Sequence, residues 1–353
     1  MAGIRVTRRE WLQGAIASAG WAMASSAAAA FATKSAGLAT NSPAKRENPA
    51  EAFRVVLPGK ILPLPEGVLS HKTAPGFKLR GIKGWAWTPS QYLAEIPVMA
   101  RYKMNFLMNC YTSLWDLELH ANGSWAQIPP GQKINHWYQP LPREKKRSYQ
   151  QVVRECQRHA MEFCFSMNPI LDSDRPFDYD QPQDLETLWQ HYAWMQGLGV
   201  KWFNVSLDDI TQGINAASQA GVVNEILRRL RAKDSGAQMI FTPTWYAGTG
   251  NSGPETHAKL GAGDTPGVRY VKELGEKLDP DVYLYWTGPE VCSVTITRAD
   301  AEKYRHLTKH RLFIWDNYPC NDQQPTLHLG PLTGRDPELS KVAEGYISNP
   351  LSP

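Results

Sequence analysis

The sequence predicts an α/β fold, a (β/α)8 TIM barrel in a single domain. Short apolar runs of strand length recur from about Leu79 onward, and each is followed by polar, glycine or proline residues and then by a stretch with helical period. Eight such units are present, which fits a closed parallel barrel. Setting aside two N-terminal segments of the 353 residues leaves about 275, an ordinary size for this barrel and too few for a second domain.

Each predicted strand is a short run of mostly apolar residues, and the eighth is weaker than the others. The predicted strands are Gly81–Trp87, Asn105–Tyr111, Glu162–Asn168, Lys201–Leu207, Gln238–Thr244, Val282–Trp286, Arg311–Trp315 and Gly345–Ser348.

Between these strands, apolar residues recur at spacings of three and four, which is typical of helices packed on one face. Basic residues near Lys233 favour a helix C-terminus, and Thr297-Arg298-Ala299-Asp300 has the form of a capping box, with Asp where Glu is usual. The basic run 143–147 opens a helix after Pro142. The other predicted helices are Pro89–Tyr102, Ser148–Met161, Asp184–Met195 and Asn215–Lys233.

The N-terminal segment 1–32 is interpreted as a twin-arginine export signal. Thr7-Arg8-Arg9-Glu10-Trp11-Leu12 precedes an uncharged Ala/Gly/Ser stretch, which ends near Ala30-Phe31-Ala32 in a small-x-small cleavage pattern. A membrane anchor is the alternative, but the stretch is a poor spanning helix because it is rich in alanine and interrupted by polar and glycine residues. We therefore expect a periplasmic or secreted protein without stable membrane association, with residues 33–77 as a linker and 78–353 as the barrel domain.

Composition excludes several classes of protein. With 42% hydrophobic residues the chain is not disordered overall, and its scattered net charge of +4 gives no nucleic-acid footprint. The cysteines lack metal-site spacing with histidine, so they are interpreted as small core residues, with a single disulfide as the alternative. We expect no metal, no cofactor and no obligate protein partner. The cysteines are Cys110, Cys156, Cys164, Cys292 and Cys320.

Chemistry in such a barrel lies at the carboxyl ends of the strands. The residues there are carboxylates, amides and aromatics, which suits sugar recognition better than phosphate recognition. The chain has 13 tryptophans, which suit either core packing or stacking on a sugar ring. The residues at the predicted strand ends are Trp85, Trp87, Asn109, Asn168, Asp172, Asp208, Asp209, Thr244, Trp245, Tyr246, Trp286, Trp315, Asp316, Asn317 and Asn349.

The sharpest feature is the pair Asp208 and Asp209 at the end of an apolar strand. Neighbouring side chains of a regular strand point to opposite faces, so both carboxylates reach one site only if the strand ends or bulges there. Two carboxylates held close raise one pKa, which suits a general acid at neutral pH. The alternative is that one of them caps the following helix.

Further motifs resemble the catalytic domain of glycoside hydrolase family 84, which contains O-GlcNAcases and bacterial β-N-acetylglucosaminidases, some once called hyaluronidases. The resemblance runs in order from about residue 79 to the end. Trp-Thr-Gly-Pro and Trp-Asp-Asn-x-x-x-Asn-Asp are its specific parts. The motifs are Arg80-Gly81-Ile82-Lys83-Gly84-Trp85, Leu207-Asp208-Asp209-Ile210, Pro243-Thr244-Trp245-Tyr246, Tyr285-Trp286-Thr287-Gly288-Pro289, Ile314-Trp315-Asp316-Asn317-Tyr318-Pro319-Cys320-Asn321-Asp322, Leu329-Gly330-Pro331-Leu332 and Ser348-Asn349-Pro350.

The resemblance implies a retaining exo-β-N-acetylglucosaminidase acting on terminal β-linked N-acetylglucosamine. In its substrate-assisted mechanism the 2-acetamido oxygen attacks the anomeric carbon and forms an oxazoline, so no enzyme nucleophile is needed. Asp208 would orient the acetamido N–H and stabilise its developing charge, whereas Asp209 would act first as general acid and then as general base.

The resemblance also implies a set of substrate-binding residues. Tyr246 would bind the acetamido oxygen, Trp315 would wall the acetamido pocket, and Asp322 would hold outer hydroxyls. The full set is Gly84, Tyr246, Trp286, Trp315, Asn317, Asp322 and Asn349. Alternatives remain: the two tryptophans as barrel core and the two asparagines as turn formers. Asp316, facing the other way, is expected to be structural.

Two departures from the family pattern leave the function open. The position of a substrate-contacting lysine after the second strand is Thr112 here, and the tyrosine expected two residues after Gly84 is Ala86. Either Lys83 or Lys103 compensates, or the pocket binds its sugar differently. The alternatives are therefore an impaired barrel that only binds N-acetylhexosamines and a hexosaminidase of different sugar specificity.

Overall fold

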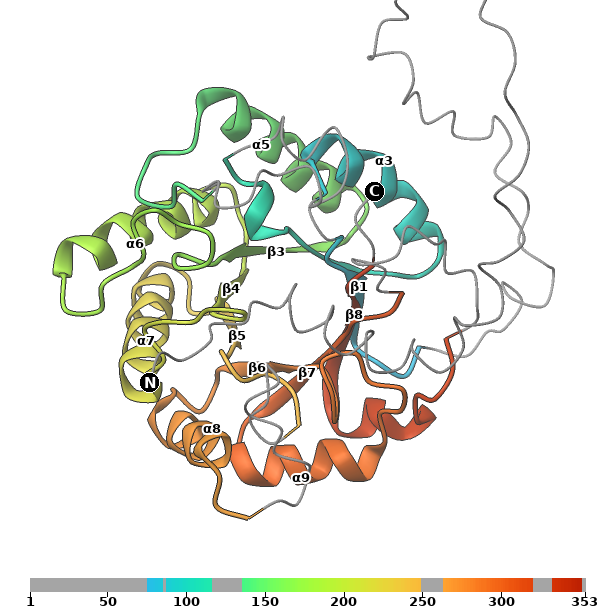
Figure 1. Cartoon of the computed structure of the whole chain (residues 1–353). Coiled ribbons are helices and arrows are strands. Elements are labelled where there is room, and N and C mark those ends of the chain that lie inside the picture. The colour runs from blue at the N-terminus through green and yellow to red at the C-terminus, as the bar shows by residue number, and fades with distance from the viewer. Residues whose placement is uncertain (1–74, 85–86, 116–134, 249–262, 320–331, 351–353) are drawn as a thin grey trace, which may run out of the picture. The chain divides into compact units, whose positions relative to one another are not determined.

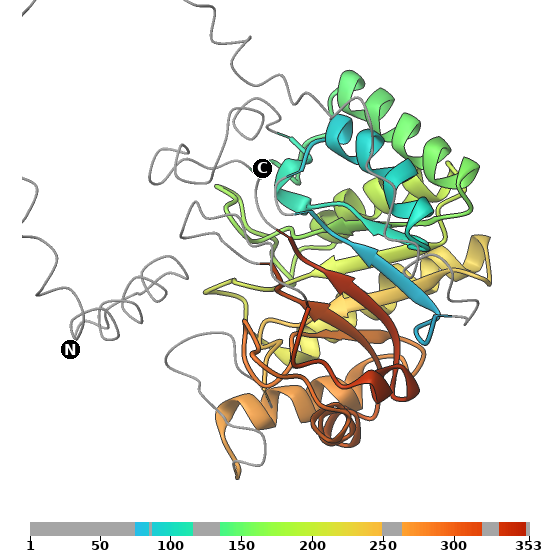
Figure 2. The ribbon, with the colours of Figure 1, turned by 90° about the vertical axis from the view of Figure 1, so that its right-hand side faces the viewer.

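The computed structural model describes residues 75–84, 87–115, 135–248, 263–319 and 332–350. Its strands form a closed parallel barrel in the order β1 to β8, which confirms the predicted fold. Figure 1 looks down this barrel, with the helices forming a ring outside the strands, and Figure 2 shows the same strands from the side. The strands are β1 (Leu79–Ile82), β2 (Phe106–Met108), β3 (Glu162–Met167), β4 (Trp202–Ser206), β5 (Gln238–Thr242), β6 (Tyr283–Trp286), β7 (Arg311–Asp316) and β8 (Ala343–Ser348).

The helices follow the predicted stretches, except that no helix was predicted over Pro266–Lys277. Asn215 caps the helix that begins at Ala216, with its side chain accepting a hydrogen bond from the backbone of Ser218, and Thr297 accepts from the backbone of Asp300 in the same way. These caps satisfy N–H groups that the first helical turn leaves unpaired. The helices are α3 (Pro89–Arg101), α5 (Arg143–Arg158), α6 (Pro182–Gln196), α7 (Ala216–Lys233), α8 (Pro266–Lys277) and α9 (Arg298–Thr308), with short 3-10 turns η2 (Tyr111–Ser113) and η5 (Pro337–Lys341).

The core has two layers because successive strand residues face opposite sides of the sheet. The inner layer fills the barrel and is largely aromatic, whereas the outer layer lies between the strands and the helices. In β6, Tyr283 and Tyr285 belong to the inner layer, and Leu284 and Trp286 to the outer one. The inner layer consists of Leu79, Phe106, Met108, Cys164, Trp202, Ile240, Tyr283, Tyr285, Phe313, Trp315 and Ile347.

Two sequence predictions need correction at this level. The first two strands are shorter than predicted, since β1 ends at Ile82 and β2 at Met108. Cys292 is exposed in the loop after β6 and is not a core residue, whereas Cys110, Cys156 and Cys164 are buried. Cys320 lies outside the described residues.

Two further properties concern only the part of the chain that the structure describes. Within it, no helix combines the length and the apolar character that crossing a membrane requires. The same residues contain no group of three or more His, Cys, Asp or Glu side chains placed to hold a metal ion.

Candidate active site

A small pocket, open at its mouth, lies at the carboxyl ends of the strands. Its walls come from strands that are far apart in sequence: β4, β5, β7 and β8. The lining residues are Asp208, Thr242, Tyr246, Trp315, Asn317 and Asn349. All of these except Thr242 were predicted from the sequence.

The two adjacent carboxylates lie just beyond the end of β4. The strand stops at Ser206, and Asp209 has a φ of 58°, in the left-handed region that residues other than glycine seldom adopt. The Tyr246 hydroxyl donates a hydrogen bond of 2.8 Å to Oδ1 of Asp209. The strand therefore ends before the two carboxylates. This meets the condition under which two adjacent side chains can reach one site. The helix-capping alternative is wrong for α7, because Asn215 caps that helix.

Asp208 lines the pocket with only 4% of its surface exposed. The Tyr111 hydroxyl donates a hydrogen bond of 2.5 Å to its Oδ2, and the Asn168 side chain donates to its backbone oxygen over 3.1 Å. Its Oδ1 has no hydrogen-bond partner among the described residues. Since a buried polar atom normally has a partner, this oxygen is available to accept an N–H or O–H from a ligand.

The charge of Asp208 results from opposing influences. Burial raises the pKa of its carboxyl above the ordinary value, and the neighbouring Asp209 adds to the rise. The Lys83 ammonium and the hydrogen bond from Tyr111 act in the opposite direction. Lys83 follows β1 and is fully buried, with its Nζ 4.4 Å from the ring centroid of Tyr111 and 4.1 Å from that of Trp315.

The opposite wall is a chain of hydrogen-bonded side chains. The Trp315 indole N–H donates to Oδ1 of Asn317 over 3.0 Å, and the Asn349 amide donates to the same oxygen over 2.8 Å. Asn317 in turn donates to the backbone oxygen of Val291 over 2.7 Å. Oδ1 of Asn349 has no hydrogen-bond partner among the described residues, so it is a second acceptor available to a ligand.

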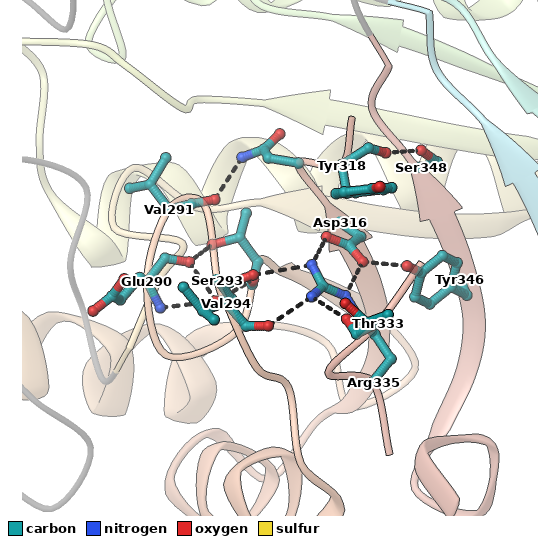
Figure 3. Close-up of polar contacts among 12 residues, drawn as sticks. Glu290, Val291, Ser293, Val294, Asp316, Tyr318, Thr333, Arg335, Tyr346 and Ser348 are labelled. Carbon is teal, nitrogen blue, oxygen red and sulfur yellow. Dashed lines mark hydrogen bonds and ion pairs between the residues drawn. The ribbon is translucent and has the colours of Figure 1, made fainter. Parts of the chain in front are cut away.

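Asp316, between the two lining residues Trp315 and Asn317, faces away from the pocket, as predicted. Arg335 donates to both of its carboxylate oxygens over 2.6 Å, and Tyr346 donates to it as well (Figure 3). The remaining guanidinium donors bind the backbone oxygens of Ser293, Val294 and Thr333. This cluster ties the loop after β6 to the ends of β7 and β8.

Other predicted residues lie apart from the pocket lining. Trp286 is in the outer core layer, stacked on Tyr304 of α9 at 5.2 Å, with its indole N–H donating to the backbone oxygen of Gly248. Trp286 is therefore a packing residue: side chains along β6 point alternately inward and outward, and the last residue of the strand, Trp286, points outward. Gly84 has a φ of 41°, and a Cβ there would lie 2.1 Å from the Trp87 ring.

The remaining strand-end tryptophans also pack against the core. Trp87 contacts the ring of Tyr92 at 5.9 Å, and Trp245 contacts that of Tyr270 at 5.0 Å. Among the described tryptophans of this group, Trp315 alone lines the pocket. The predicted residues Asp322, Trp85 and Ala86 lie outside the described residues.

The residues considered in place of the family's substrate-contacting lysine lie in different parts of the barrel. Thr112 forms a hydrogen bond of 2.9 Å with the Cys110 thiol. Lys103 is exposed and precedes β2, so it lies at the amino-terminal end of the barrel, away from the pocket. Lys83 lies beside the pocket wall, and Tyr111 contacts Asp208. Tyr111 and Thr242 were missed, because each was assigned to an apolar strand.

This arrangement combines two kinds of carboxylate. Asp208 is buried, oriented by Tyr111 and offers one oxygen to a ligand, whereas Asp209 is partly exposed and is held by Tyr246. The first suits a residue that binds and polarises a donor group. The second is not among the lining residues but binds the lining residue Tyr246, and its partial exposure suits proton transfer.

Comparisons with known proteins agree with this geometry. A family model described as beta-N-acetylglucosaminidase (NAGidase) matches residues 81–353. The Protein O-GlcNAcase of Rattus norvegicus and that of Mus musculus are each 28% identical to this chain over 225 residues. The match covers 61% of this chain and 23% of each relative, so the chain spans less than a quarter of the relatives' length.

Solved structures share the fold. An O-GlcNAc hydrolase mutant of Thermobaculum terrenum has a TM-score of 0.62 and 24% identity, with 78% of this chain and 55% of that chain covered. The structure of CpGH84B has a TM-score of 0.62 and 23% identity, with 78% and 45% covered. At these identities the likeness supports the barrel and leaves the chemistry to the residues of the pocket.

Proposed function

Because the chain belongs to glycoside hydrolase family 84, the beta-N-acetylglucosaminidase family, we propose that it is a retaining exo-β-N-acetylglucosaminidase working by substrate assistance. The observation that carries the proposal is the buried Oδ1 of Asp208, which has no hydrogen-bond partner among the described residues and belongs to a wall of the pocket. It suits the N–H of a 2-acetamido group. A pocket closed below by the aromatic barrel core suits a terminal sugar rather than the interior of a chain.

In the proposed reaction, Asp208 accepts the acetamido N–H and so directs the acetamido oxygen toward the anomeric carbon. That oxygen forms a bond to the carbon while the glycosidic bond breaks, and Asp209 donates a proton to the leaving oxygen. The product is an oxazolinium ion that keeps its N–H hydrogen-bonded to Asp208. Water then attacks the same carbon, the bond from that carbon to the acetamido oxygen breaks, and Asp209 removes a proton from the water. Trp315, Asn317 and Asn349 hold the sugar against this pair.

Tyr246 has a place in the same sequence of steps. In the structure its hydroxyl donates to Asp209 over 2.8 Å. We propose that this hydroxyl turns to the acetamido oxygen when substrate binds, which releases Asp209 to carry its proton. Tyr246→Phe should then lower kcat more than it raises KM.

The test uses aryl N-acetyl-β-glucosaminides with leaving groups of different acidity. The wild type should hydrolyse them with retention, and Asp209→Asn should lose roughly 10²- to 10⁴-fold for poor leaving groups, the usual contribution of a general acid. Its loss should shrink for acidic leaving groups that need no proton. The Asp208→Asn loss should not depend on the leaving group.

The opposing outcomes are equally specific. Undetectable turnover of several N-acetylhexosaminides by the wild type would refute the proposal that the protein is a hydrolase. If calorimetry then showed binding of N-acetylglucosamine without turnover, the protein would be a sugar-binding module. Faster hydrolysis of the galacto epimer than of the gluco substrate would change the sugar specificity that we assign. Failure of a stable thiazoline mimic of the oxazoline to inhibit would argue against acetamido participation.

We also propose that the chain is exported through a twin-arginine route. The support is the pattern of residues 7–12 with the uncharged stretch that follows. Replacing Arg8 and Arg9 by lysine should leave the protein in the cytoplasmic fraction. Periplasmic recovery of that variant would refute the assignment.

A further inference from the structure

We propose that Lys83 is a positioning residue, a buried counter-charge that, together with Tyr111, keeps Asp208 ionised and oriented in the pocket. This inference rests on the proposed function, because it concerns the carboxylate that would bind the acetamido N–H. It gives a function to a lysine that is not among the residues lining the pocket.

The position of Lys83 follows from the alternation of β1. Lys83 is the first residue after β1, and its backbone N–H still donates to the backbone oxygen of Ser348 in β8 over 3.0 Å. The alternation that places Leu79 in the inner core layer therefore continues to Lys83 and directs its side chain toward the barrel axis. Its ammonium lies 4.4 Å from the ring centroid of Tyr111 and 4.1 Å from that of Trp315. Both distances are well within the range of cation–π contacts, which strengthen when the cation is removed from water.

The two rings connect this cation to the pocket from different elements. Trp315 lines the pocket directly, and the Tyr111 hydroxyl donates to Oδ2 of Asp208 over 2.5 Å. The lysine thus stands behind the wall, not in contact with the space a sugar would fill. It acts on ligands only through Asp208, Tyr111 and Trp315.

Asp208 needs such a counter-charge. Burial raises the pKa of its carboxyl, and so does the adjacent Asp209, while the Lys83 ammonium and the Tyr111 hydrogen bond lower it. The described titratable or charged groups that act on it are Lys83 after β1, Tyr111 after β2 and Asp209 after β4, and Tyr246 after β5 lines the same pocket and binds Asp209. Cys110 acts on Tyr111. Lys83 supplies positive charge to this set.

Tyr111 remains a donor throughout the working pH range. Burial raises the pKa of its hydroxyl well above the ordinary value, and the charges of Asp208 and Asp209 raise it further. It therefore fixes the direction of Oδ2 without competing for the proton, which leaves Oδ1 directed to the ligand. An ionised Oδ1 accepts an N–H more strongly than a protonated carboxyl does.

The test is the pH profile of kcat/KM for an aryl N-acetyl-β-glucosaminide with wild type, Lys83→Met, Lys83→Arg and Tyr111→Phe. Lys83→Met keeps the length and removes the charge, so the acidic limb should move up by at least about one pH unit, equivalent to a tenfold change in the ionisation equilibrium. Lys83→Arg should keep the limb near its wild-type position. Tyr111→Phe should move it up by less.

The control is Lys103→Met, which removes a lysine from the opposite end of the barrel and should leave the profile unchanged. A Lys83→Met profile that is lower at every pH, with its acidic limb unmoved, would overturn the proposal, since a merely structural role predicts that result. If Lys83→Met does not fold, an unmoved acidic limb in Tyr111→Phe together with an upward shift in Lys83→Arg would overturn it as well.

A direct titration separates this inference from the proposed function. In protein labelled with ¹³C at aspartate carboxyls, the Asp208 signal is assigned by its loss in Asp208→Asn and followed against pH. An upward shift of its midpoint in Lys83→Met supports the counter-charge even if no glycoside is hydrolysed. An unchanged midpoint refutes it even if the wild type is an active glycosidase.

Discussion

Replacing Arg335 by methionine should destabilise the barrel strongly, because it leaves a buried carboxylate without its cation. The Arg335 side chain is 11% exposed and that of Asp316 only 1%. Arg335 binds both oxygens of Asp316 and three backbone oxygens (Figure 3). Removing one partner of a buried, hydrogen-bonded pair costs about 3–5 kcal/mol.

That free energy translates into a measurable shift of the thermal midpoint. For chains of this size each kcal/mol lowers the midpoint by roughly 2–4 °C, so Arg335→Met should unfold roughly 6–20 °C below the wild type. The assay is differential scanning calorimetry or circular dichroism at neutral pH. Because the pair anchors the segment between Trp315 and Asn317, KM should also rise at temperatures where the variant is folded.

The matched control is Arg228→Met on α7, which breaks an exposed pair with Glu225. Its midpoint should stay close to that of the wild type, since ion pairs between exposed side chains contribute little. An Arg335→Met midpoint within about 2 °C of the wild type would refute the reasoning, because so small a shift corresponds to a loss of less than about 1 kcal/mol.

Three further predictions follow from single residues. Asp208→Asn should be more stable than the wild type at neutral pH, because the raised pKa of Asp208 makes its ionisation unfavourable in the folded chain. This advantage should vanish below pH 3, where Asp208 is protonated in both the folded and the unfolded chain. Chemical unfolding at several pH values measures the difference. Trp286→Phe leaves the Gly248 oxygen without its donor and should lower stability by about 1–3 kcal/mol in urea unfolding while KM stays unchanged. Gly84→Ala, with a φ of 41° and its Cβ against Trp87, should cost more than about 1 kcal/mol by the same measurement; a stability equal to the wild type would contradict it.

The barrel was predictable because its signals are local. Each strand is an apolar run and each helix has its own period and cap, such as Asn215 before α7. The count of eight then closes the sheet without any knowledge of the contacts. The end of β2 was not predictable in this way: Cys110 and Tyr111 continue the apolar run, yet the chain has already left the sheet. Burial in the core between the strands and the helices, not pairing in the sheet, explains why these residues are apolar or aromatic.

The failure with Trp286 has a different cause. Both β6 and β7 are buried on both faces, so their sequences carry no polar and apolar alternation from which the inner face could be identified. Trp286 and Trp315 each stand near a strand end with similar neighbours. Only the register of the closed barrel directs Trp315 inward to the pocket and Trp286 outward to α9.

The positions of the two carboxylates could be predicted from the sequence, whereas the groups that set their charge could not. Asp208 and Asp209 are adjacent, so one strand end is enough to predict both. The groups that set the charge of Asp208 come from other strands, and a lysine followed by glycine in the sequence resembles an ordinary surface residue. The structure shows that Lys83 is instead buried against Tyr111 and Trp315. A motif can therefore indicate which carboxylates carry the chemistry, but their protonation depends on residues that only the closed barrel brings together. The pH profile of Lys83→Met consequently tests the assembled site, whereas Asp209→Asn tests only the motif.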